Sequence, residues 1–64
     1  MTPLSSRERE LIQHYAAGRS QKQAARAMGI SVHTAKDYAE RIRSKFHADS
    51  TIQAVVAAQR MGLL

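Results

Sequence analysis

The chain has 64 residues and no cysteine, so it has room for one small domain that no disulfide can stabilise. It contains no apolar run of membrane-spanning length, and residues 1–15 lack the apolar stretch of a signal peptide, so we expect a cytoplasmic protein with no membrane partner. The formal net charge of +5 is concentrated in residues 19–45, which carry seven Lys and Arg against two acids. A positive segment of this kind suits a polyanion such as nucleic acid, although a basic helix can equally be a solvated face.

Serine and glycine mark where the chain begins and ends helices. Four serines can each cap a helix by accepting a hydrogen bond from the amide three residues ahead: Ser5, Ser20, Ser31 and Ser50. All but Ser31 are followed three residues later by Glu or Gln, which completes a capping box. Three glycines follow apolar or alanine-rich stretches, where a left-handed residue ends a helix: Gly18, Gly29 and Gly62. These marks predict an all-α chain with helices at about 6–17, 21–28, 32–46 and 51–61.

Apolar residues at helical spacing predict which side of each helix is buried. The core candidates of the first three helices are Leu11, Ile12, Tyr15 and Ala16, then Ala24, Ala25 and Met28, then Ala35, Ala39, Ile42 and Phe46, flanked by Tyr38. In the fourth helix, Ile52, Val55 and Val56 begin a short core stripe. The other side of that helix is mostly small and suits the close approach of another helix: Ala54, Ala57, Ala58 and Met61.

The segment 28–30 joins the second and third helices tightly. Gly29 can end one helix abruptly, Ile30 can turn inward, and Ser31 can begin the next helix. Two helices joined in this way, with glycine in the turn, are typical of a helix-turn-helix unit. An ordinary helical hairpin has the same local signals, so the turn alone leaves both interpretations open.

The third helix has an outward face suited to reading DNA. When its residues are placed at 100° intervals with Ala35 at the centre of the core side, six side chains point outward: His33, Lys36, Asp37, Glu40, Arg41 and Ser44. Thr34 lies at the margin of this face. The first two turns of the helix offer donors and acceptors to base edges, while Arg41, Arg43 and Lys45 follow where contacts to phosphates are expected. A helix that enters DNA by its N-terminus also offers free amides to a phosphate, at Ser31 and just after it.

Four stretches of the chain resemble the LuxR/FixJ (GerE-like) helix-turn-helix family. They are LSSRERE at 4–10, AGRSQKQAA at 17–25, GISVHTAK at 29–36, and AVVAA at 54–58 followed by MGLL at 61–64. Together they cover nearly the whole chain in the family's order. The resemblance implies a four-helix DNA-binding domain that acts as a dimer on two-fold-related half-sites. It also implies that the third helix enters the major groove and the fourth supplies the dimer contact.

The same resemblance assigns roles to individual residues. Lys36 is the first choice for a base contact, with three neighbours beside it: His33, Asp37 and Glu40. The positions that match holders of the DNA backbone are Lys22, Ser31 and Thr34, and the weaker phosphate candidates are Arg41 and Arg43. A solvated side chain is the alternative for Lys22 and Arg43. The residues expected at the dimer interface are Ala54, Ala57, Ala58 and Met61.

Several positions depart from the family pattern. Ala24 and Ala35 stand where larger β-branched residues are usual, so the core between the second and third helices should be lighter. His47 replaces a common glycine after the third helix, which puts the geometry of the following turn in question. Asp37 and Glu40 stand where neutral or basic residues are common.

The two acids on the reading face have two interpretations. They can select sequence by accepting a hydrogen bond from a cytosine amino group, or orient Lys36 and Arg41. They can instead form ordinary intrahelical ion pairs, because Lys36–Glu40 and Asp37–Arg41 are each four residues apart. For Asp37 the sequence leaves both open.

No pattern indicates catalysis or a cofactor. The histidines, His14, His33 and His47, are far apart and lack the carboxylate or thiol spacing of a metal site. No nucleophile is paired with a base, and there is no glycine-rich phosphate loop. We therefore expect no enzyme activity, no metal, no cofactor and no small-molecule ligand.

The sequence thus predicts a bacterial transcription regulator that binds specific double-stranded DNA as a homodimer on an inverted repeat. The main alternative is a dimeric protein-interaction module acting on another regulator or polymerase. A general nucleic-acid coating protein fits less well, because it would gain nothing from acids on its reading face. From the start at Met1 and the family-like end at Leu64 we expect residues 1–64 to be a complete small protein, a single domain without a receiver or ligand-binding domain.

Overall fold

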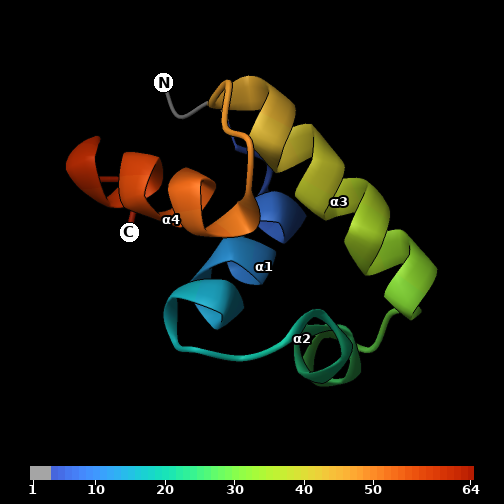
Figure 1. Cartoon of the computed structure of the whole chain (residues 1–64). Helices are drawn as coiled ribbons and strands as arrows, with labels where there is room; N and C mark the ends of the chain where they lie inside the picture. Colours follow the sequence, from blue (N-terminus) through green and yellow to red (C-terminus); the bar gives the residue numbers. More distant parts are fainter. Residues whose placement is uncertain (1–3) are drawn as a thin grey trace.

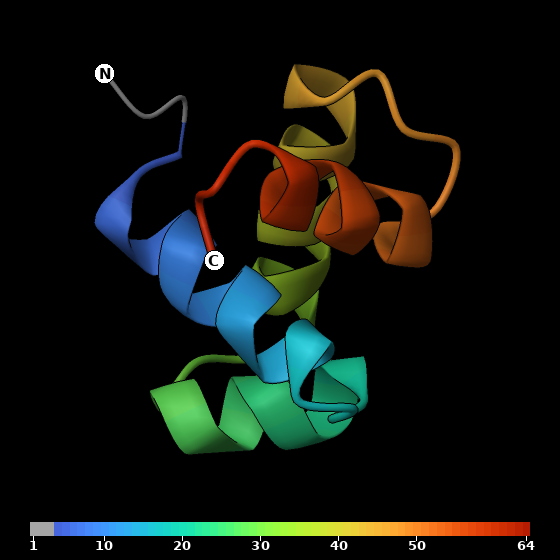
Figure 2. The same ribbon diagram turned by 90° about the vertical axis from the view of Figure 1, so that its left-hand side faces the viewer.

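A computed structural model describes residues 4–64, in which there are four α-helices and no strand. The helices are α1 (Ser6–Ala16), α2 (Gln21–Met28), α3 (Val32–Lys45) and α4 (Thr51–Arg60). Figure 1 shows α3 along one side of the molecule, with α2 near its beginning and α4 nearer its end. In the view of Figure 2, α1 lies between α2 and α4 in front of α3. The expected all-α, four-helix fold is confirmed, and every helix end lies within one residue of its expected position.

Each helix begins at the serine that the sequence marks. The capping boxes Ser5/Glu8 and Ser20/Gln23 are complete, with both hydrogen bonds formed. The third box is only half formed, because the Gln53 side chain accepts from the amide of Asp49, at 2.8 Å, and not from that of Ser50. The backbone of Ser50 is more extended than that of the other caps, with φ −145°, and this brings the preceding amide to Gln53.

All four helices also end in the same way. The residue after the last turn has a positive φ, and the next amide donates to the carbonyl five residues back, as in a Schellman motif. Three of these left-handed residues are glycines, and the fourth is His47, with φ 52°. The bond from the Ala48 amide to the Arg43 carbonyl, at 2.9 Å, completes the motif at His47. The turn therefore keeps the geometry that a glycine would give, at a cost of about 1–2 kcal/mol for an L-residue.

The core is small and built mainly from alanine. Leu11 and Ile12 of α1 are its largest fully buried side chains. Of the eleven buried apolar residues in the described part of the chain, six are alanines. Ala24 of α2 and Ala35 of α3 have no exposed surface, so these two helices meet through small side chains, as their sequence indicates. A larger residue forced into such a site costs about 1–3 kcal/mol.

The expected orientation of α4 is wrong. Ala54 and Ala58, assigned from the sequence to a dimer interface, are fully buried in the core of the single chain. Ile52 and Val56, assigned to the core, are exposed. Both sides of this helix are apolar, so periodicity alone could not separate them. The small alanines let α4 approach α1 and α3 closely, and the larger side chains consequently turn outward.

A buried ion pair joins the beginning of α1 to the end of α3. Glu8 is 3% exposed, and its Oε1 accepts hydrogen bonds from the Ser5 amide, at 2.9 Å, and from Lys45 Nζ, at 2.5 Å. Burial alone raises the pKa of Glu8, but the hydrogen bonds from Lys45 and Ser5 outweigh it, so the pKa lies below its ordinary value. The sequence predicted the capping role of Glu8 but not its partner on α3.

Replacing Glu8 with Gln removes this charge and keeps the shape of the side chain. We expect Glu8→Gln to lower the free energy of unfolding near neutral pH by about 1–3 kcal/mol, because hydrogen bonds to a charged group are lost. Since the folded-state pKa is lowered, the stabilisation is present above the unfolded-state pKa of about 4.3 and is lost as pH falls through the folded-state value. Urea unfolding followed by circular dichroism should therefore show a steeper loss of stability toward acid in the wild type than in Glu8→Gln.

Glu10→Gln is the matched control. Like Glu8, Glu10 forms an ion pair, in this case with Arg7 at 3.3 Å. Both of these side chains are exposed, and an ion pair at an exposed position contributes at most about 1 kcal/mol. An equal effect of the two substitutions, or the same acid dependence in wild type and Glu8→Gln, would contradict the role given to the Glu8–Lys45 pair.

Candidate nucleic-acid interface

The turn between α2 and α3 has the geometry of a helix-turn-helix. Gly29 has φ 69°, and the amide of Ile30 donates to the carbonyl of Ala25 at 3.0 Å. Ile30 packs against the core, as expected, and so anchors the turn. Arg7 of α1 adds a bond from outside the unit, because its Nη2 donates to the carbonyl of Met28 at 3.2 Å. The turn is thus held by both its own backbone and α1.

Two hydroxyls organise the first turn of α3. Ser31 Oγ accepts from the amide of Thr34 at 3.0 Å and donates to Thr34 Oγ1 at 2.9 Å. The Thr34 hydroxyl can therefore direct its own proton to an outside acceptor. The next amides, those of Val32 and His33, have no acceptor within the helix and point along its axis. This end of α3 can thus donate several hydrogen bonds to an anion.

The outward side of α3 is polar and exposed, as expected from its helical positions. The exposed members of the predicted set are His33, Lys36, Glu40, Arg41 and Ser44, and Asp37 is half-buried. Figure 1 shows the beginning of α3 at one extremity of the molecule, beyond α2.

Neither ion pair considered from the sequence is present. Asp37 Oδ2 lies 3.7 Å from Nε2 of His33, one turn earlier, and not beside Arg41. The guanidinium of Arg41 lies over the ring of Tyr38, 5.8 Å from its centre. Within residues 4–64, Lys36 and Glu40 form no ion pair, so both charged groups are available to a partner.

The basic residues of the central segment differ in their exposure and in whether they contact other residues of the fold. Lys22 and Arg26 are exposed on α2, on the same side of that helix. Lys45 is held by Glu8, and Arg43 is half-buried near Tyr15. Burial raises the pKa of Tyr15, and the positive charge of Arg43 opposes this shift only partly. Arg43 therefore lies partly inside the fold, which leaves Lys22 as the better placed of the two for contact with a phosphate.

The outer side of α4 exposes several large apolar side chains. Ile52 is 76% exposed, and Val56 and Met61 are also exposed. With half-buried Ala57, they line a shallow groove that Gln53 and Arg60 border. Of the four residues expected at an interface, Ala57 and Met61 thus face outward. Figure 1 shows that α4 lies away from the beginning of α3, so both elements could be engaged together.

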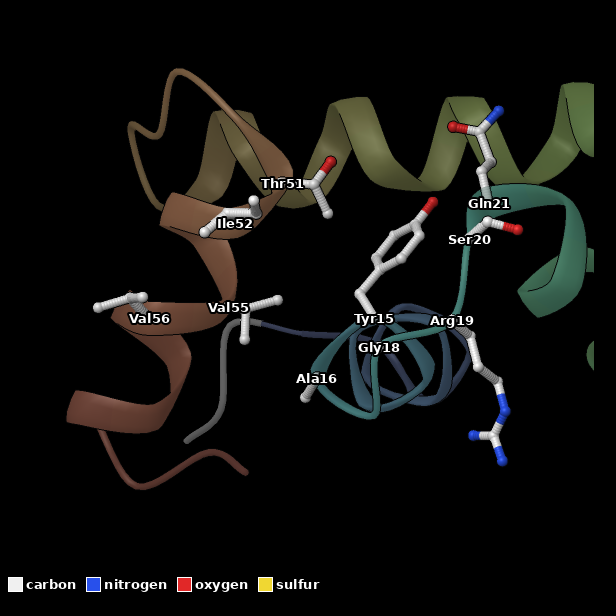
Figure 3. Close-up of a pocket in the computed structure, with 10 residues that line it drawn as sticks. All are labelled: Tyr15, Ala16, Gly18, Arg19, Ser20, Gln21, Thr51, Ile52, Val55 and Val56. Carbon is white, nitrogen blue, oxygen red and sulfur yellow. The ribbon is translucent and has the colours of Figure 1, made fainter.

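A second groove of about 500 Å³ lies between the end of α1 and the beginning of α4. Figure 3 shows the ring of Tyr15 inside it, facing Thr51 and Val55, with the Arg19 side chain turned away. The Tyr15 hydroxyl is buried and has no hydrogen-bond partner among residues 4–64. Arg19 contacts His14 Nδ1 at 3.1 Å. The groove therefore offers apolar contact but few groups that would orient a polar ligand.

No three His, Asp or Glu side chains in the described part of the chain are grouped so that they could hold a metal ion. Among the same residues, no helix has both the length and the apolar character needed to cross a membrane.

Sequence comparison identifies relatives among bacterial regulators. The profile of bacterial regulatory proteins of the luxR family matches residues 2–58. The HTH-type transcriptional activator RamA of Corynebacterium glutamicum is 38% identical over 63 residues, or 98% of this chain. The matched region is 22% of RamA, so the chain corresponds to a small part of that relative.

Solved structures with the same fold include the transcription factor GerE, with a TM-score of 0.91 and 26% identity over 97% of this chain and 92% of GerE. VqmA bound to DPO gives a TM-score of 0.87 at 36% identity, covering 95% of this chain and 30% of VqmA. The Vibrio cholerae VqmA dimer, solved without its target DNA, gives 0.89 at 35% identity, covering 97% of this chain and 28% of VqmA. The chain therefore belongs to the LuxR family of bacterial regulatory proteins, as a helix-turn-helix domain of the DNA-binding transcription regulators.

Proposed function

We propose that residues 1–64 act as one domain that binds specific double-stranded DNA with α3 in the major groove. The observation that carries the proposal is the beginning of α3, which lies at an extremity of the molecule beyond α2, together with the exposed Lys36 and Glu40, which form no ion pair within residues 4–64. An α-helix fits the width of the major groove, where every base pair presents a distinct set of donors, acceptors and methyl groups. The relatives GerE and RamA are described as a transcription factor and a transcriptional activator.

The proposal gives base contacts to the first two turns of α3. Lys36 is the main base reader, because its ammonium group is exposed and unpaired within residues 4–64. Glu40, one turn further along, is an acceptor for a cytosine amino group. His33 and Asp37 act together, since the imidazole lies close enough to orient the carboxylate. This contact supports His33 as the partner of Asp37, in place of Arg41, which the sequence suggested.

Contacts to the DNA backbone flank these residues. The Thr34 hydroxyl and the free amides at the Ser31 cap form one group of donors to a phosphate. Lys22, exposed on α2, supplies a charge for the same strand. Arg41 and Arg43 are placed further along α3, with Arg43 the more restricted because it is half-buried.

We further propose that two copies pair through the outer side of α4, on DNA with two-fold-related half-sites. The surface consists of Ile52, Val56, Ala57 and Met61, and the buried Ala54 and Ala58 support it from within. An exposed apolar surface of this kind is typical of an interface. A dimer is described for VqmA. A two-fold axis in the protein would select an inverted repeat in the DNA.

The central experiment selects binding sites from a random duplex library with wild-type protein and with Lys36→Ala. We expect the wild type to enrich an inverted repeat. Lys36→Ala should lose about 1–3 kcal/mol of binding free energy and relax preference at one position in each half-site. Equal weakening on all sequences would contradict base reading by Lys36. No enrichment by folded wild-type protein would favour the protein-interaction module.

Lys22→Ala tests the backbone contact. Because Lys22 is proposed to neutralise one phosphate, its loss should weaken binding to every sequence similarly and reduce the slope of log affinity against log salt by about one. Fluorescence anisotropy at several salt concentrations measures this slope. Arg9→Ala, on α1 and outside both proposed surfaces, is the control and should leave the slope unchanged. An unchanged slope in Lys22→Ala would remove Lys22 from the DNA contacts.

Val56→Asp tests the α4 interface. A charge in the middle of the apolar surface should prevent pairing, because it cannot be buried without a partner. Sedimentation on DNA with one and two half-sites should show two wild-type copies on the inverted repeat and loss of cooperative binding in the variant. Gln13→Asp, at an exposed polar position on α1, is the charge-matched control. Cooperative binding by Val56→Asp would contradict this interface.

A further inference from the structure

Val32, the first residue of α3, exposes a large apolar side chain. It is 46% exposed. The other exposed large apolar residues in the described part of the chain belong to α4 or to the residues after it: Ile52, Val56, Met61 and Leu64. Val32 is instead the first residue of α3, and the beginning of this helix lies at an extremity of the molecule, away from α4 (Figure 1).

The fold gives no reason for valine at this position. The first helical position favours proline or an acid, which complement the free amides, and β-branched residues lower helix propensity. The side chain does not contribute to the core, because nearly half of it is in contact with solvent. Its neighbours also make their own pairs, Ser31 with Thr34 and His33 with Asp37. A residue that breaks local preferences without a packing role is expected at a functional surface.

The position of Val32 relative to Lys36 indicates what it could contact. The two residues are four apart, so they lie on the same side of α3. If Lys36 reaches the edge of one base pair, Val32 lies one helical turn closer to the N-terminus and faces a neighbouring pair. In the major groove the apolar group on a base edge is the C5-methyl of thymine.

We infer that Val32 contacts the C5-methyl group of a thymine and so contributes to the choice of operator sequence. This inference rests on the proposed function, in which α3 enters the major groove. Valine offers two methyl groups and no hydrogen-bonding atom, so it distinguishes thymine from the other bases by apolar contact alone. It also avoids the repulsion that an acid at this position would exert on phosphates.

Deoxyuridine provides the test, because it lacks only the methyl group of thymidine and keeps its base pairing. Each thymidine of the selected operator is replaced in turn, and affinity is measured for wild-type protein and for Val32→Ala. We expect one position in each half-site at which deoxyuridine weakens wild-type binding by about fourfold, the effect of one methyl group returned to water. Val32→Ala should bind the thymidine and deoxyuridine forms of that position equally.

Two controls separate this result from loss of structure or function. Alanine is a better helix former than valine, so Val32→Ala should fold, which circular dichroism checks. Leu64→Ala removes an exposed apolar side chain far from α3 in sequence and should keep the wild-type response to deoxyuridine. A wild type insensitive to every deoxyuridine, or a sensitive position that stays sensitive in Val32→Ala, would overturn the inference. Neither result would bear on the proposed function, because that is tested separately by the enrichment of an inverted repeat from the duplex library.

Discussion

The buried carboxylate of Glu8 is the constraint on which the arrangement of helices depends. Its Oε1 accepts two hydrogen bonds. One comes from the amide of Ser5, at the cap of its own helix, and the other from Lys45, at the end of α3. Its neighbour Arg7 bonds to the carbonyl of Met28, where α2 ends. The first turn of α1 thus holds both the end of α3 and the turn between α2 and α3. These polar contacts set the angles between the helices, because the small alanines of the core would allow several packing angles.

The alanine-rich core explains how so short a chain presents such a long third helix. Small side chains bring α2 and α4 close to α3, so few residues are needed to bury its inner side. The small side chains also bury less apolar area, so alanine stabilises the fold through the hydrophobic effect much less than leucine or isoleucine would. Hydrogen-bonded caps at both ends of every helix partly offset this loss.

The sequence predicted the helices well because their boundaries are encoded locally. A serine and a glycine at the two ends of a helix act through their own backbone neighbours, and no distant contact is needed to read them. His47 is the exception, because it adopts a left-handed conformation, with φ 52°, that no glycine at that position announces. The outward side of α3 was predictable for a similar reason, because regular helical spacing separates it from Ala35.

The orientation of α4 and the partners of charged residues could not be predicted in this way. Ala54 and Ile52 are both apolar, and the packing distance between helices decided which one became buried. Lys45 could equally have been a solvated residue, since nothing near it in sequence identifies Glu8 as its partner. The roles given to Lys36 and Lys22 came from resemblance to a family, and remain proposals for measurement.

The exposed side of α3 has an evolutionary consequence. Lys36 and Glu40 make no ion pair within the described chain, and Val32 is not part of the core, so replacing them leaves the packing of α3 on α1 and α2 intact. Substitutions at these positions should therefore be nearly neutral for folding. A gene duplicate could diverge in its preferred operator one residue at a time, without first acquiring compensating mutations elsewhere in the domain.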